Sequence, residues 1–99
     1  MSLVQIQSED RRLIMLRALD ESGYDANETV LKLATEQFGH HATRDMVRGD
    51  LTFLAENNLI RLEKLAAQSG EIWIAHLLNA GQEVAQGRVY PGVARREPG

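Results

Sequence analysis

The sequence predicts a mainly α fold with a small β-hairpin, in the order α-α-α-β-β-α. Apolar residues recur at helical spacing in three segments before residue 58. Two segments then alternate between apolar and polar residues, at 59–65 and 71–77. A short helical segment follows at 79–87, and the rest of the chain has no periodicity. We therefore assign residues 1–87 to a single domain and residues 88–99 to an extended or disordered C-terminal tail.

The first helix is expected over residues 8–23. Ser8 is the expected cap, because its side-chain oxygen can accept a bond from a free backbone N–H of the first turn, and Gly23 supports the end. The preceding stretch "SLVQIQ" has two interpretations, a short strand or an extension of this helix that carries Leu3 and Ile6. As a helical extension it would carry these two side chains past a small core, where a partner chain could bury them.

The second and third helices are expected over residues 27–39 and 43–57. Asn27 and Thr43 are their expected caps, and Gly39 is the expected stop of the second helix. The third helix has a buried stripe formed by Val47, Leu51 and Leu54. Gly49 lies inside this helix at a cost of about 1 kcal/mol relative to alanine. We therefore expect Gly49 to let another backbone or a ligand approach closely.

The two alternating segments predict a hairpin joined by "AAQSG", residues 66–70. A lone hairpin is only marginally stable in water, so its apolar face should pack on the helices. Trp73 shares a strand face with Ala75 and Leu77, and we expect it in the core rather than stacked on a ligand. Three helices followed by such a hairpin is the arrangement of a winged helix-turn-helix domain.

Residues 43–63, "TRDMVRGDLTFLAENNLIRLE", resemble winged-helix transcription regulators of the ArsR/MarR type, in which a recognition helix runs into a hydrophobic strand. The downstream "WIAHLLNAGQEVAQGR" is similar to the strand and final helix of that fold. Where those regulators carry a capping threonine this chain has Leu78, so Asn79 is the expected cap. With "RDMVRGDL", "VAQGR" and "PGVARR", nearly the whole chain further resembles a family of small proteins from Mu-like bacteriophages. That resemblance implies a phage or prophage setting.

The winged-helix resemblance implies a DNA-binding protein of phage or prophage origin, such as a transcriptional regulator, with the helix at 43–57 as recognition helix and double-stranded DNA as partner. Arg44 and Arg48 are four residues apart and share a helix face. We expect them, with Thr52, to point away from the buried stripe, as side chains that enter a major groove must. Because neither arginine belongs to the core, replacing both should remove DNA reading and leave the fold intact. The candidate DNA-binding residues are Thr43, Arg44, Arg48, Thr52, Arg61 and Lys64.

A structural interpretation of the same residues stays open, in which the arginines pair with Asp45, Asp50 or Glu28. The net charge of −3 counts against DNA binding, and the hairpin tip has no basic residue. The alternative function is a protein–protein interaction module in phage assembly or host takeover, with a phage or host protein as partner and no DNA binding. A continuous positive surface favours DNA, and one broken by acidic residues favours a protein.

Enzymatic and membrane functions are not expected. The chain has no cysteine, its three histidines do not form a metal-binding pattern, and its carboxylates are scattered. We expect no cofactor and no metal. No apolar run approaches the roughly 20 residues of a membrane span, so we expect no membrane association and a location in the cytoplasm of the bacterial host cell. If the N-terminus is helical, Leu3 and Ile6 extend past a small core, and winged-helix regulators are often dimers built through terminal helices, so we expect a homodimer through the N-terminal segment.

Overall fold

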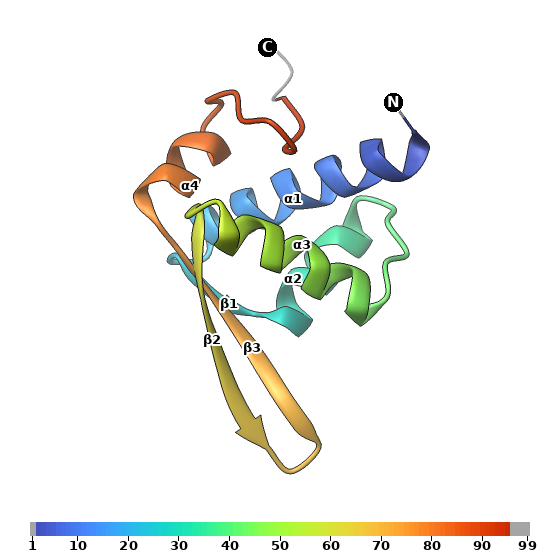
Figure 1. The fold of residues 1–99 in the computed structure, drawn as a ribbon, viewed down its shortest axis with the longest axis vertical. Coiled ribbons are helices and arrows are strands. Elements are labelled where there is room, and N and C mark those ends of the chain that lie inside the picture. The colour runs from blue at the N-terminus through green and yellow to red at the C-terminus, as the bar shows by residue number, and fades with distance from the viewer. Residues whose placement is uncertain (1, 96–99) are drawn as a thin grey trace.

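A computed structural model of the chain describes residues 2–95 (Figure 1). This part of the chain forms four helices, α1 (Leu3–Glu21), α2 (Glu28–Gln37), α3 (Arg44–Glu56) and α4 (Asn79–Ala85). It also forms three strands, β1 (Asp25–Asn27), β2 (Ile60–Ala67) and β3 (Gly70–Leu77). The strands make one antiparallel sheet in the order β1-β3-β2. The result is a small mixed α/β fold that contains the expected helices and hairpin, with β1 as an addition.

Helix α1 begins six residues before the position expected from the sequence. Ser2 caps it, with its Oγ accepting a bond from the backbone N–H of Gln5 at 3.1 Å, while Gln5 Oε1 accepts from the Ser2 N–H at 3.1 Å. This reciprocal pair satisfies two N–H groups that would otherwise lack partners. Ser8 therefore lies inside the helix, and its assignment as the cap was wrong. "SLVQIQ" takes the helical alternative and not the strand.

The caps expected for the next two helices are confirmed. Asn27 Oδ1 accepts from the N–H of Val30 at 2.9 Å at the start of α2. Thr43 Oγ1 accepts from the N–H of Met46 at 3.2 Å at the start of α3. Helix α4 differs, because Leu78 is its cap residue and makes no side-chain bond there. The expectation that Asn79 caps α4 was wrong, since Asn79 is already the first helical residue.

The hairpin is confirmed and is longer than expected, with Gln68 and Ser69 as its connection. Its far end projects away from the helices (Figure 1). Strand β1 was not predicted, because three residues are too short to show alternation. It exists because the free edge of β3 supplies partners, with Asp25 opposite His76 and Asn27 opposite Ile74. The sheet thereby gains a strand that ties the start of α2 to the hairpin.

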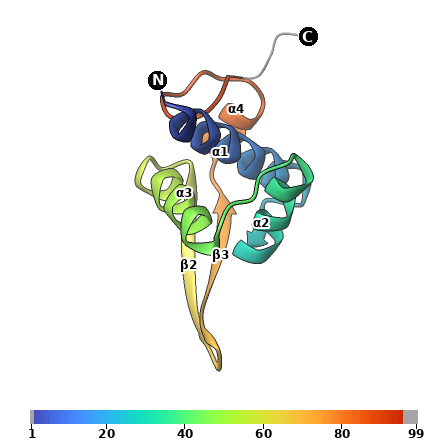
Figure 2. The same cartoon turned by 90° about the vertical axis from the view of Figure 1, so that its right-hand side faces the viewer.

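The core lies between the helices and the upper part of the sheet. Helix α1 lies across α2 and α3, with α4 and the C-terminal segment on its other side (Figure 2). The expected stripe of Val47, Leu51 and Leu54 is fully buried. Packed with it are Met15, Leu16 and Leu19 of α1, Leu31 of α2, and Leu59, Ile60 and Ala75 at the base of the hairpin. None of the helices in residues 2–95 is long and apolar enough to cross a membrane.

Two glycines have opposite roles in this packing. An added Cβ at Gly81 of α4 would lie 2.0 Å from the carbonyl oxygen of Leu59, so only glycine allows α4 to approach the start of β2. An added Cβ at Gly49 of α3 would meet no atom within 4 Å. No backbone of the described chain approaches Gly49, and within the domain the close approach occurs at Gly81. The alternative of a ligand at Gly49 stays a prediction.

The C-terminal segment packs on the domain, where an extended or disordered tail was expected. Arg12 Nη1 of α1 donates to the carbonyl of Gly92 at 2.9 Å, and the Tyr90 hydroxyl donates to Asn57 Oδ1 at 2.7 Å. The backbone N–H of Ala94 donates to the carbonyl of Glu9 at 3.1 Å, and the Val93 side chain is buried. Residues 88–95 have no helix or strand, yet residues 90–94 belong to the packed structure. The rest of the expected tail, 96–99, lies outside the described residues.

Candidate nucleic-acid interface

The orientation of α3 decides which of its side chains are available. Successive residues of an α-helix are rotated by about 100°, so the buried stripe fixes the opposite, outward face. That face carries Asp45, Gly49, Thr52 and Glu56, of which Asp45, Gly49 and Glu56 are exposed. Arg44 and Arg48 lie on the flank between the two faces. The expectation that both arginines stand opposite the stripe was wrong, because the helix turns them towards α2 and the hairpin.

Glu28, the first residue of α2, holds both arginines. Its side chain is only 1% exposed. It accepts from Arg48 Nε at 2.7 Å, from Arg48 Nη2 at 2.9 Å and from the backbone N–H of Trp73 at 2.7 Å. Arg44 Nη1 lies 3.2 Å from the same carboxylate. The hydrogen bond from Arg48 is the largest of the effects that lower the pKa of Glu28, and Glu28 in turn raises the pKa of Arg48. One buried carboxylate thus joins α2, α3 and β3.

Trp73 continues this arrangement onto the hairpin. The Arg48 guanidinium lies 4.7 Å from the ring centroid, and Lys64 Nζ lies 4.2 Å from it. Arg48 Nη2 also donates to the backbone carbonyl of Glu71 at 2.9 Å, and Trp73 Nε1 donates to Glu71 Oε1 at 2.9 Å. Cations over an aromatic face are attracted by its quadrupole. The indole packs on the core, as expected, and its ring also bridges Arg48 and Lys64.

A groove between the C-terminal half of α3 and β2 brings three of the expected residues together. It has a volume of about 570 Å³, and Thr52, Arg61 and Lys64 line it with Glu56 and Asn58. The Thr52 hydroxyl donates to the backbone carbonyl of Arg48 at 2.8 Å, so its oxygen is available mainly as an acceptor. No local sequence pattern indicates the groove, because it depends on how the hairpin leaves α3.

The six expected residues therefore differ in their exposure and in their contacts within the protein. Thr43 is exposed and acts as the cap of α3. Arg44 is half-exposed, and Arg61 and Lys64 are exposed. Arg48 contacts Glu28 of α2 on one side and the hairpin on the other, so replacing it would disturb packed structure. This differs from the expectation that replacing both arginines leaves the fold intact. Of the structural pairings considered from the sequence, the one with Glu28 is confirmed for both arginines.

The carboxylates around this surface are also of two kinds. Asp50 is buried and pairs with Arg11 Nε at 2.7 Å and Arg12 Nε at 3.2 Å on α1, so it does not interrupt the surface. Burial raises the pKa of Asp50, and the two arginines oppose that effect. Asp45, Glu56 and Glu71 are exposed and do bring negative charge next to the cations. Across residues 2–95, no group of histidines and carboxylates could hold a metal ion.

Comparison with known proteins places the chain in a family. It is 39% identical over 94 residues to the protein gp26 of Escherichia phage Mu, and the matched region covers 94% of both chains. The chain belongs to the family of this phage Mu protein. A member in Haemophilus influenzae is 42% identical over 65 residues, which is 66% of this chain and 64% of that protein. Both relatives are named as uncharacterized proteins, so their names state no activity. No family model and no solved structure matches the chain.

Proposed function

We propose that the chain is a winged-helix protein that binds double-stranded DNA, with α3 as the recognition helix and the β2–β3 hairpin as the wing. The observation that carries the proposal is the connected surface from Arg44 through Arg48, Trp73 and Lys64 to the groove with Arg61. The order of helices and strands, with a projecting hairpin beside α3, agrees with this fold. A transcriptional regulator of a phage or prophage, acting in the cytoplasm of the host cell, would use such a surface.

The contacts we propose are mainly to phosphates. Arg44, Arg61 and Lys64 present charge that no other described residue fully neutralises, and such cations act on the DNA backbone irrespective of sequence. The Nε and Nη2 groups of Arg48 donate hydrogen bonds within the protein, so we assign Arg48 the role of holding the wing against α3. Thr52 and Gly49 are small, so a groove edge can approach α3 closely at these positions. Base discrimination by the arginine pair is no longer part of the proposal.

A salt titration tests this proposal. Three phosphate contacts correspond to a slope of about −2.7 in log K against log salt, which is about a fortyfold loss of affinity between about 50 and 200 mM salt. Fluorescence anisotropy with a labelled random duplex measures this slope. The double variant Arg44→Ala/Arg61→Ala should flatten the slope by about 1.8, because it removes two of the contacts. Glu56→Gln should bind more tightly, since it removes a carboxylate from the groove.

Arg88→Ala is the matched control, because Arg88 is an exposed arginine that follows α4 and lies outside this surface. It removes one positive charge, against the two that the double variant removes, and should leave the slope unchanged. Absence of wild-type binding to any duplex at low salt would sink the DNA proposal, as would an unchanged slope in the double variant.

The second candidate is a protein-docking module on the same fold, without DNA binding. The outward face of α3 favours it, because Asp45 and Glu56 are exposed there and would face the phosphates. The net charge of −3 acts in the same direction. A phage or host protein with a basic surface would be the complementary partner. Absence of DNA binding by the wild-type protein at low salt would support this candidate over the first.

A further inference from the structure

Helix α1 has an outward face that the rest of the domain leaves open. Met15, Leu16 and Leu19 define its buried side. At about 100° per residue the opposite side carries Leu3, Ile6, Asp10, Arg17 and Glu21, whereas Ile14 among them is covered and only 7% exposed. The first turns extend beyond the core, and the Leu3 residue is 67% exposed. Such an exposed apolar side chain on a helix that projects past the core suits a contact with another molecule.

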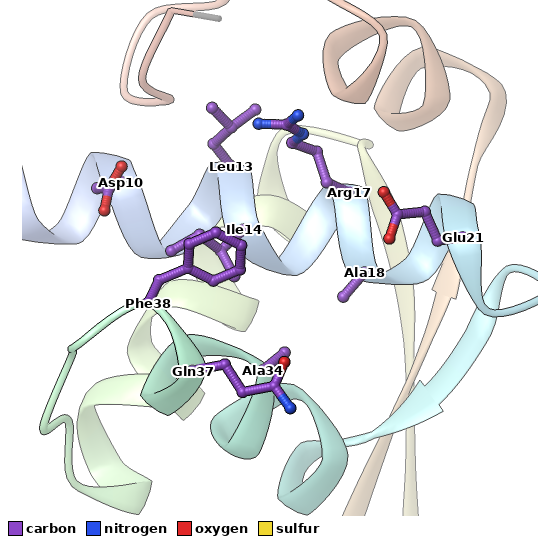
Figure 3. Close-up of a pocket in the computed structure, with 9 residues that line it drawn as sticks. All are labelled: Asp10, Leu13, Ile14, Arg17, Ala18, Glu21, Ala34, Gln37 and Phe38. Atoms are coloured by element: carbon purple, nitrogen blue, oxygen red, sulfur yellow. The ribbon is translucent and has the colours of Figure 1, made fainter.

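A groove between α1 and α2 adjoins this face. It has a volume of about 250 Å³ and is lined by apolar residues of both helices together with Asp10, Arg17 and Glu21. Phe38, at the end of α2, lies beside Ile14 and is 69% exposed (Figure 3). A phenylalanine this exposed next to a groove leaves a large apolar area in water, and burying that area against another molecule is favourable.

The charged side chains on this face have few hydrogen-bond or ion-pair partners within residues 2–95. The side chains of Arg17 and Glu21 form no hydrogen bond or ion pair with any other residue in 2–95. Asp10 uses Oδ2 to bond His40 Nε2 at 2.6 Å, and its side chain remains 49% exposed. Asp10 and Arg17 are seven residues apart, so they point in directions that differ by only about 20° and lie about 10 Å apart along the helix.

We propose that this face binds a second copy of the same chain, with the two α1 helices antiparallel about a two-fold axis between residues 13 and 14. In that register Asp10 of each copy meets Arg17 of the other, so the ion pair forms twice. Phe38, which lies beside the buried Ile14, is next to the axis and packs against Phe38 of the second copy.

Charge complementarity selects this occupant. An acidic and a basic residue placed symmetrically about one point of a helix form a face that complements itself when turned by 180°. A partner of other chemistry would need its own matching pair at the same spacing. The inference uses neither α3 nor the hairpin, so it stands independently of the proposed DNA binding, and its experiment contains no DNA.

Charge reversal combined with mixing tests the arrangement. Asp10→Arg places two cations on each copy, and Arg17→Asp places two carboxylates on each copy. Each variant alone should dissociate at least about tenfold more readily than wild type, because both symmetric pairs become repulsive. An equimolar mixture of the two variants should form a heterodimer, because every contact then joins opposite charges. Sedimentation velocity measures the species, and far-UV circular dichroism verifies that each variant is folded.

Arg61→Asp is the matched control, since it makes the same charge change on β2, and it should dimerise like wild type. Phe38→Ser provides a second route, because it removes apolar contact near the axis without touching a charge and should weaken the dimer. A wild-type protein that stays monomeric at about 100 μM would overturn the proposal. So would single variants that dimerise normally, or a mixture of folded variants that shows no heterodimer.

Discussion

Replacing Arg48 with alanine should destabilise the fold strongly, although Arg48 is only partly buried on the flank of α3. The guanidinium donates twice to Glu28, once to the carbonyl of Glu71, and lies over the ring of Trp73. Glu28 is buried, so its charge cannot be solvated by water when the arginine is removed.

The expected loss follows from what remains around Glu28. Removal of one partner of a buried ion pair costs about 3–5 kcal/mol. Arg44 at 3.2 Å and the backbone N–H of Trp73 at 2.7 Å still face the carboxylate after the substitution. Arg48 is itself partly exposed, so we expect a loss below that range but clearly above the roughly 0.5 kcal/mol of an ordinary surface substitution. For a domain of this size each 1 kcal/mol lost lowers Tm by about 4–8 °C.

Thermal and urea unfolding followed by far-UV circular dichroism measure this loss. Arg48→Lys should fall between wild type and alanine, because lysine keeps the charge and loses the two-pronged contact with Glu28. Arg61→Ala is the control, since Arg61 is exposed and forms no ion pair with residues 2–95, and it should stay within about 0.5 kcal/mol of wild type. If Arg48→Ala were as mild as the control, Arg48 would be a free side chain in solution. Arg48 would then be available to contact DNA bases.

Three further outcomes are expected. Gly81→Ala should lose about 1–3 kcal/mol of unfolding free energy, because its Cβ would clash with the carbonyl of Leu59. Gly49→Ala should gain up to about 1 kcal/mol from helix propensity. Equal effects of the two substitutions in denaturant titrations would contradict the packing of α4. Because the pKa of Glu28 is lowered in the folded state, its charge stabilises the fold above the unfolded pKa of about 4.3, and this contribution is lost as the pH falls through the lowered value. The stability advantage of wild type over Glu28→Gln should therefore shrink between about pH 5 and pH 3, and a constant difference would count against the buried pair. Val93→Ala should cost about 2 kcal/mol, since Val93 is 5% exposed, and a change below about 0.5 kcal/mol would mean that the C-terminal segment does not pack in solution.

Sequence reasoning succeeded where the deciding interactions are local. Asn27 and Thr43 bond to backbone groups three residues later, so a short window contains the whole cap. The same reasoning failed at Ser8, because Ser2 and Gln5 form a better start together and the helical pattern continues through both candidates.

The candidate site was only partly predictable for the same reason. The spacing of Arg44 and Arg48 places them on one helix face, and that was correct. Which way the face points depends on Glu28, twenty residues earlier, and on Trp73, which lies on the other side of the hairpin turn. A buried carboxylate attracts an arginine more strongly than solvent does, and no local pattern reveals that the carboxylate is buried.

The sequence by itself determined the helices, the hairpin and the buried stripe of α3, because periodicity and caps are encoded within a few residues of each other. Tertiary structure alone decided the pairing of Asp50 with Arg11 and Arg12, the packing of residues 90–94, and the existence of β1. Each of these joins segments far apart in the chain. Their energies arise only when folding removes water from both partners, so they depend on the placement of whole elements and not on any one segment.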